Sequence, residues 1–266
     1  MKRSTMPDRE VSIGAVKSRG SWRPERSVCI ADALELLLDR VEEDFDCPEP
    51  RVTEELLPFS TGLVALDRVC GGGLHSGIVT VLECPLPSHA RSLLFSVARG
   101  TDVPTMLAVD DLEQGATWLL AGASGVPAKL IEQRELSERD WDAISARVGV
   151  LADQELVMTE ARSAGGIEHL IREDRSMILI VDEPGRLGPV EDVLWWLTQV
   201  AEATGVACLT SVGDLSHLTG YLKSEMVNVT VVPHTMGGRA TLVSTDCDDG
   251  FAVAHVQVAM LVGDAS

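Results

Sequence analysis

The sequence predicts an α/β domain with a largely parallel central sheet and a C-terminal β-hairpin. Short apolar runs rich in β-branched residues alternate with amphipathic stretches through most of the chain. This alternation is typical of parallel strands covered by helices on both faces. Near the C-terminus two strand-like runs flank a turn-rich segment, which indicates a hairpin that extends the sheet.

The expected elements follow from these patterns. We expect strands at 78–82, 105–109, 177–181, 206–210 and 228–232. We expect helices at 91–98, 112–121, 137–152, 167–172 and 190–203. The hairpin pairs 239–244 with 252–261 through a turn at 245–250. Ser137 and Asp140 resemble a capping box, and Gly205 stands where a helix C-cap is expected.

Two segments precede this domain. Residues 1–28 are polar and without periodicity, so we expect a disordered basic tail. Residues 29–46 form an amphipathic linker helix, and the main domain covers 58–262. The chain has a net charge of −19, although residues 1–26 carry seven Lys and Arg against three acids. The rest of the chain therefore repels nucleic acid, and we expect DNA contact only through the tail.

Cysteine usage and hydropathy restrict the class of protein further. None of the six cysteines forms a CxxC pair, so we expect reduced thiols and no metal site. No apolar run reaches the roughly 20 residues that span a bilayer, and no secretory signal is evident. We expect a cytoplasmic protein without membrane contact.

One stretch carries a specific resemblance. Residues 60–67 read Ser-Thr-Gly-Leu-Val-Ala-Leu-Asp, and residues 71–77 read Gly-Gly-Gly-Leu-His-Ser-Gly before the first expected strand. The glycines allow a tight approach to that strand, and Leu63, Leu66 and Val69 anchor a helical turn. This order of residues resembles the entry to ATPase domains of the RecA superfamily.

A second region narrows the resemblance. Residues 119–141 contain Leu-Leu-Ala, then Ser-Gly-Val, then a Leu-Ser-Glu-Arg-Asp-Trp helix start, similar to the C-terminal motor domain of DnaB-type replicative helicases. Asp182 follows a strand as in a Walker B motif. The resemblance implies a RecA-like three-layer domain of the P-loop NTPase superfamily. It also implies a homo-oligomer formed through helix 29–45 and a link to DNA replication, recombination or repair.

The phosphate-binding loop departs from the family pattern G-x-x-x-x-G-K-[S/T]. Residues 83–92 read Glu-Cys-Pro-Leu-Pro-Ser-His-Ala-Arg-Ser, with no glycine and no lysine. Such a loop needs glycines to aim backbone N–H groups at phosphate, and a lysine to neutralise its charge. Aligned from the strand, Glu83, Ser88, His89 and Ala90 take the motif positions. Aligned from the helix, Arg91 and Ser92 substitute for Lys-Thr, and the sequence leaves both registers open.

Other parts of the catalytic apparatus are incomplete. Asp110 and Asp111 lie near the expected catalytic acid, but their spacing is off by about one residue. Val212 stands at the position of a polar sensor. Residues 245–249 carry three acids where a Lys/Arg pair is expected. Because phosphoryl transfer depends on positioning and charge neutralisation, losing these groups together should abolish turnover.

The sequence is compatible with three functions. The first is a pseudo-ATPase that acts as a protein-binding or regulatory component, with no catalytic residue, cofactor or metal expected. The alternative is a divergent ATP-dependent DnaB-like helicase, with Asp110, Asp182 and Glu183 catalytic, Ser92 and Asp182 holding Mg²⁺, and ATP as cofactor. The third is an accessory protein that binds DNA through its basic tail, against which the acidic body argues.

Overall fold

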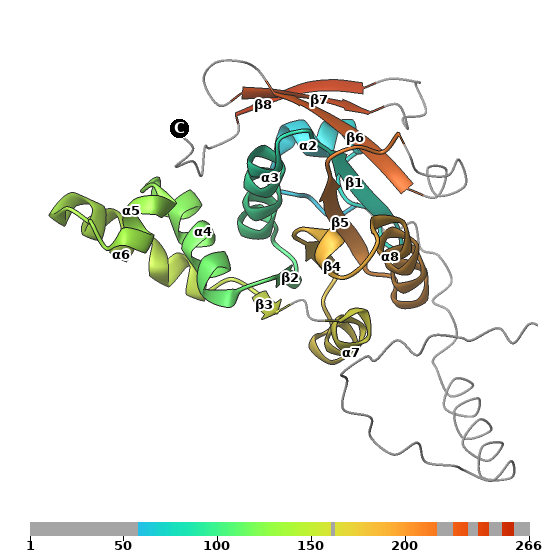
Figure 1. The fold of residues 1–266 in the computed structure, drawn as a ribbon, viewed down its shortest axis with the longest axis horizontal. Helices are drawn as coiled ribbons and strands as arrows, with labels where there is room; N and C mark the ends of the chain where they lie inside the picture. Colours follow the sequence, from blue (N-terminus) through green and yellow to red (C-terminus); the bar gives the residue numbers. More distant parts are fainter. Residues whose placement is uncertain (1–57, 161–162, 217–225, 234–238, 245–251, 258–266) are drawn as a thin grey trace, which may run out of the picture. The chain divides into compact units, whose positions relative to one another are not determined.

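Eight strands form one sheet in the computed structural model, which describes residues 58–160, 163–216, 226–233, 239–244 and 252–257 (Figure 1). The expected tail, the linker helix and the expected turn at 245–250 lie outside the described residues. No helix in the described part combines the length and apolar content needed to cross a membrane.

The strands confirm the predicted sheet. They are β1 (Val79–Glu83), β2 (Thr105–Val109), β3 (Leu156–Glu160), β4 (Ile178–Val181), β5 (Ala207–Val212), β6 (Met226–Pro233), β7 (Arg239–Ser244) and β8 (Ala252–Gln257). Their order is β3-β2-β4-β5-β1-β6-β7-β8. The pairings from β3 through β6 are parallel. The last two, β6–β7 and β7–β8, are antiparallel, which confirms the C-terminal hairpin.

The helices begin and end largely at the signals that the sequence offers. They are α2 (Val64–Val69), α3 (Pro87–Gly100), α4 (Leu112–Ser124), α5 (Ala128–Gln133), α6 (Glu138–Ala152), α7 (Ala164–Asp174) and α8 (Val190–Thr204), with a 3-10 turn η1 (Pro184–Arg186). Ser137 forms the expected capping box with Asp140. Gly205 ends α8 in the left-handed conformation, at φ 72°. Both caps satisfy backbone groups that have no partner inside the helix.

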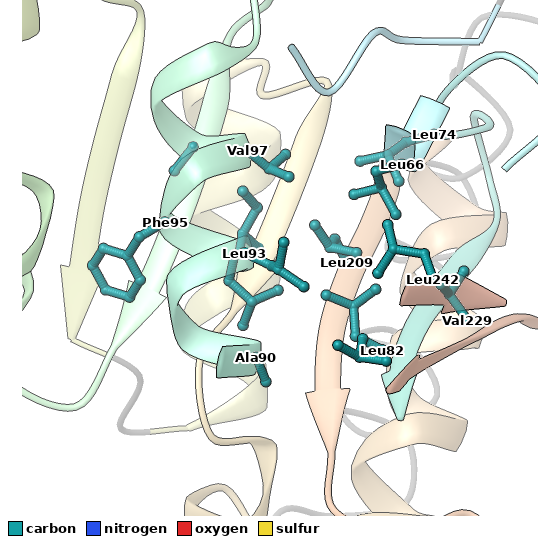
Figure 2. Packing of buried hydrophobic residues seen from close by; sticks show 14 of the residues in the cluster. Leu66, Leu74, Leu82, Ala90, Leu93, Phe95, Val97, Leu209, Val229 and Leu242 are labelled. Carbon is teal, nitrogen blue, oxygen red and sulfur yellow. The ribbon is translucent and has the colours of Figure 1, made fainter. Parts of the chain in front are cut away.

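Side chains alternate between two apolar clusters, one on each face of the sheet. On one face Leu107, Ile180 and Leu209 pack with α2, α3 and α4. Figure 2 shows the centre of this cluster, where Leu93 and Val97 of α3 face the sheet. On the other face Met106 and Leu179 pack with α7 and α8. Two buried faces explain why the central strands are continuously apolar, and they give the predicted three layers.

The glycine-rich entry motif packs backbone against backbone. Gly73 has φ 143°, and a Cβ there would stand 2.2 Å from the carbonyl oxygen of Phe59. A Cβ on Gly62 would stand 2.3 Å from the carbonyl oxygen of Gly100. The Asp67 carboxylate accepts hydrogen bonds from the Thr61 N–H at 2.8 Å and the Thr61 hydroxyl at 2.6 Å. The motif therefore closes the entry segment on itself and fixes it against the end of α3.

Three features differ from the expected elements. Strand β3 and helix α5 were not expected, and α3 begins at Pro87 rather than at residue 91. Strand β3 is an edge strand whose residues are exposed or half-buried, so it lacks the apolar run of its neighbours. The early start of α3 has a direct cause, since proline fixes φ near the helical value and suits the first helical position. This start decides the geometry of the site.

Candidate functional site

The connection from β1 to α3 is only three residues long. Strand β1 ends at Glu83 and α3 begins at Pro87, with Leu86 as its N-cap. The Leu86 carbonyl already accepts hydrogen bonds from the N–H groups of His89, at 3.0 Å, and Ala90, at 3.2 Å. A phosphate-binding loop needs several residues between strand and helix to surround a phosphate. Here the helix begins after three residues, so this connection is too short to surround a phosphate.

The inside of this turn is occupied by Cys84. Its side chain is buried, with 1% exposed, and its thiol donates to the Leu86 carbonyl at 3.2 Å. Its N–H donates to the Val212 carbonyl at 2.8 Å, which ties the turn to the end of β5. Burial raises the pKa of the Cys84 thiol, although backbone hydrogen bonds from Leu86 and Ala90 oppose this. The thiol therefore stays protonated near neutral pH and is a poor nucleophile.

Arg91 extends from the second turn of α3 to the end of β4. Its Nε donates to both carboxylate oxygens of Asp182, at 3.2 and 2.9 Å, and its Nη2 donates to Glu183. The guanidinium also stacks 3.9 Å from the ring centroid of Trp118 on α4. The Trp118 ring in turn makes an edge contact with Phe95, with centroids 5.5 Å apart. Arg91 is thus held by two carboxylates and an aromatic face at once.

A second arginine completes this network. Arg186 of η1 donates to Glu183 and to Asp110, which follows β2. Arg186 therefore bridges the carboxyl ends of β2 and β4. Glu183 itself has φ 51°, a left-handed conformation that costs an ordinary residue about 1–2 kcal/mol. We call these five residues the Arg91 network: Arg91, Arg186, Asp110, Asp182 and Glu183.

Burial dominates the ionisation of Asp182. Its side chain is only 5% exposed, and desolvation raises its pKa above the ordinary value. The charges and hydrogen bonds of Arg91 oppose this shift, and the charge of Arg186 does so more weakly. Because the pKa of Asp182 is raised overall, the charge and hydrogen bonds of Arg91 offset only part of the cost of burying this carboxylate.

A pocket of about 260 Å³ opens at the carboxyl ends of β1, β4 and β5. Cys84, Pro87 and Ala90 line it from the start of α3, and Val190 and Val212 add apolar side chains. Arg91, Asp182, Glu183 and Asp214 are its charged lining. Its volume lies below the roughly 300–1,000 Å³ typical of small-molecule sites.

The structure places the residues of the degenerate loop in different surroundings. The Glu83 carboxylate accepts from the Leu215 N–H at 3.0 Å and from the Thr230 hydroxyl at 3.3 Å, so it anchors the segment that follows β5 and holds β6. Ser88 and His89 are half-buried on the first turn of α3 and do not line the pocket. Ala90 lines the pocket, whereas Ser92 is buried in α3 with 2% exposed. Arg91 is the residue of this loop whose side chain donates to Asp182.

The remaining predicted residues do not form a catalytic group in the described part of the chain. Asp111 is the N-cap of α4 and accepts from the Gln114 N–H at 2.7 Å. Val212 is buried, at the position where a polar sensor was sought. Residues 245–249 lie outside the described part of the chain. Among the residues that the structure describes, no group of three or more His, Cys, Asp or Glu side chains is placed to hold a metal ion.

Sequence reasoning missed two members of the site. Arg186 follows the catalytic candidates Asp182 and Glu183 but belongs to no motif of its own, so the sequence does not single it out. The signal was its position three residues after Glu183, which lets the two side chains meet across one turn. Trp118 was not singled out because nothing in the sequence shows which side chain its ring faces.

The strand order and the site at the carboxyl ends of β1, β4 and β5 define a domain with the RecA-type fold. No protein-family model and no curated protein matches the sequence. Solved structures do match, and they show the fold through structure rather than sequence.

Two of these structures are a DnaB-like replicative helicase and a recombinase. The structure titled "The Structure Of A DnaB-Like Replicative Helicase And Its Interactions With Primase" matches with a TM-score of 0.60 and 15% identity. The match covers 85% of this chain and 63% of that one, so this chain spans less than two thirds of the helicase. The RadB recombinase is also similar, at 15% identity and a TM-score of 0.46, over 73% of this chain and 94% of that one. The similarity to the DnaB-like helicase confirms the predicted fold.

Proposed function

We propose that this protein is a pseudo-ATPase: a catalytically inactive RecA/DnaB-like protein that works as a protein-binding or regulatory component in DNA replication, recombination or repair. One observation carries the proposal. The guanidinium of Arg91 already occupies the space between Asp182 and Glu183, where a nucleotide site of this fold needs a metal ion and phosphate.

Electrostatics supports this reading. A triphosphate entering the pocket would meet Glu183, Asp182 and Asp214. At an effective dielectric constant near 20, each phosphate–carboxylate pair at roughly 4 Å costs about 4 kcal/mol. Arg91 could offset this only by leaving Asp182, and a buried carboxylate without a partner costs about 3–5 kcal/mol.

Backbone geometry supports it as well. Pro85 and Pro87 lack N–H groups, and the N–H of Cys84 is bonded to Val212. The N–H groups of His89 and Ala90 are bonded to Leu86 within the first turn of α3. Five of the residues that would form a phosphate cradle therefore have no N–H group to offer it. We infer that the protein uses neither ATP nor Mg²⁺ as a cofactor.

The alternative is a divergent ATP-dependent DnaB-like helicase, and one contact favours it. Arg91 faces Asp182, as a phosphate-binding cation faces the Walker B acid when the motif is aligned from the helix. Under this alternative Arg91 would swing from Asp182 to phosphate, and Asp110 or Glu183 would activate water.

Calorimetric titration of the full chain with ATP and Mg²⁺ tests the proposal. We expect no binding heat up to millimolar ATP, for the reasons of charge and backbone geometry given above. Micromolar binding that is lost in Arg91→Ala and kept in Arg172→Ala would establish the alternative. Arg172 is a matched control because it is exposed and, in the described part of the chain, pairs with Glu168, four residues earlier on α7.

The partners belong to the same proposal. We propose protein partners, a homo-oligomer formed through helix 29–45, and DNA contact only through the basic tail. Light scattering of the full chain and of a chain lacking residues 1–46 tests the oligomer. A larger particle for the full chain than for the truncated one supports it, and equal monomers contradict it.

A further inference from the structure

The outer side of helix α8 carries an exposed aromatic residue among acids. The opposite side of the helix packs on the sheet, where Leu194, Leu197 and Ala201 are fully buried. Trp195 lies on the outer side, and its side chain is 54% exposed. Residues three, four and seven positions away along the helix share its stripe. We call this stripe the α8 outer face, and its members are Glu191, Asp192, Trp195, Gln199 and Glu202.

The carboxylates of the α8 outer face have no partner among the residues that the structure describes. The side chains of Glu191, Asp192 and Glu202 make no hydrogen bond or ion pair there, and α8 contains no Lys or Arg. The neighbouring helix α7 differs, because its Glu168 pairs with Arg172, four residues later, at 3.2 Å. A solvated helix commonly balances its charges through such pairs. The unbalanced negative charge is therefore a property of the α8 outer face itself.

Two members of this face oppose the stability of the isolated domain. Glu202 lies in the last turn of α8, where the helix dipole disfavours a negative charge and favours Lys or Arg. Trp195 leaves a large apolar surface in water. Tryptophan is enriched in interfaces, because it adds an electron-rich face that attracts cations to a large contact area. Residues with a local cost and no gain inside the domain are expected at functional sites.

A segment of opposite charge is present in the same sequence. Residues 1–26 carry seven Lys and Arg against three acids, whereas the whole chain has a net charge of −19. Two copies of so acidic a protein repel each other, so the homo-oligomer proposed above needs positive charge between them. We propose that the α8 outer face of one copy binds the basic residues 1–26 of a second copy. Lys or Arg side chains of that segment stack on Trp195 and pair with the carboxylates beside it.

The inference rests on the proposed function, because it names a contact within the proposed homo-oligomer. In a two-fold dimer the contact forms twice, since each copy provides one basic segment and one α8 outer face. Two weak contacts that form together bind more strongly than either alone. The charges involved are exposed on the α8 side, so the contact should weaken as salt is added.

A labelled peptide of residues 1–26 is the probe, titrated with the full chain at low salt and followed by fluorescence anisotropy. We expect Trp195→Ala to weaken its binding at least about fivefold. Trp141→Ala is the matched control, because Trp141 is 57% exposed on α6 and should leave the affinity unchanged. Equal weakening by both substitutions, or a peptide that does not bind, would overturn the inference.

The variant Glu202→Gln separates binding from folding. It removes a charge that the helix dipole disfavours, so the melting temperature should stay the same or rise slightly. Its affinity for the peptide should nevertheless fall about twofold to fivefold and depend less on salt. An unchanged affinity would show that Glu202 does not contact the basic segment.

Light scattering of the full chain tests whether the contact joins two copies. The wild type should form a larger particle than Trp195→Ala at the same concentration, and added salt should dissociate it. A full chain that stays monomeric while the peptide still binds would contradict a contact between copies. A particle that persists unchanged in Trp195→Ala would overturn this inference and leave the oligomer through helix 29–45 standing. ATP titration tests the pseudo-ATPase separately, so the failures are distinguishable.

Discussion

Replacing Arg91 with methionine should lower the free energy of unfolding by about 3–5 kcal/mol, the range for removing one partner of a buried ion pair. Asp182 would keep its burial, with 5% of the side chain exposed, and lose the Arg91 Nε–H that both of its oxygens share. Methionine keeps an unbranched side chain of similar length, so the loss reports mainly on the lost cation, including its contact with the Trp118 ring. Urea denaturation at neutral pH measures it.

Two further variants complete this experiment. The double variant Arg91→Met, Asp182→Asn should recover most of the lost stability, because neither buried charge is then left alone. Arg172→Met removes an exposed pair with Glu168 and should cost no more than about 0.5 kcal/mol. If the double variant is as unstable as Arg91→Met, the ion pair is not the cause of the loss.

The Arg91→Met deficit should also depend on pH. The pKa of Asp182 is already raised by burial, and removal of Arg91 raises it further because the main opposing charge is gone. A raised pKa in the folded state means that the charged form is penalised by folding. The penalty is complete above the folded pKa and disappears as pH falls below the unfolded value near 4. The stability difference between wild type and variant should therefore shrink from pH 7 toward pH 4. The other charged groups of the Arg91 network, Asp110, Glu183 and Arg186, are present in both proteins.

Gly73→Ala should destabilise the domain by about 2–6 kcal/mol. The new Cβ would meet the Phe59 carbonyl oxygen at 2.2 Å, and φ 143° is a conformation that only glycine adopts easily. Strain of this kind costs about 1–3 kcal/mol, and overpacking adds a similar amount. The loss should appear as a lower denaturation midpoint with an unchanged slope.

Gly149 provides the control for this change. It lies in α6, it is exposed, and a Cβ there meets nothing within 4 Å. Gly149→Ala should therefore stabilise the domain by about 0.5–1 kcal/mol, since alanine is the better helix former. A similar effect of both substitutions would show that the close approach at Gly73 does not control stability.

The central strands could be predicted from the sequence because both of their faces are buried, which makes the whole run apolar. Strand β2 was predicted at its observed bounds, and its five residues are all buried. Strand β3 could not be found this way, because it lies at the sheet edge and none of its residues is fully buried. The glycine-rich entry motif was informative for a different reason. Its residues are fixed by backbone contacts, which tolerate few alternatives.

The site was harder to predict because its side chains come from separate elements. Sequence left two registers for the loop, and the start of α3 at Pro87 decides that Arg91 faces Asp182. The bridge from Arg186 to Asp110 joins residues 76 positions apart and depends on the order of β2 and β4 in the sheet. No local pattern contains that information.

The stacking of Arg91 on Trp118 also provides an intrinsic optical probe. The indole contacts the guanidinium with its face and makes an edge contact with the Phe95 ring, so its fluorescence depends on whether the guanidinium stays in place. Any ligand or partner that draws Arg91 away from Asp182 must change the environment of that indole. Emission from Trp118, isolated by replacing the other tryptophans, would therefore follow events at the carboxyl ends of the strands without an added dye.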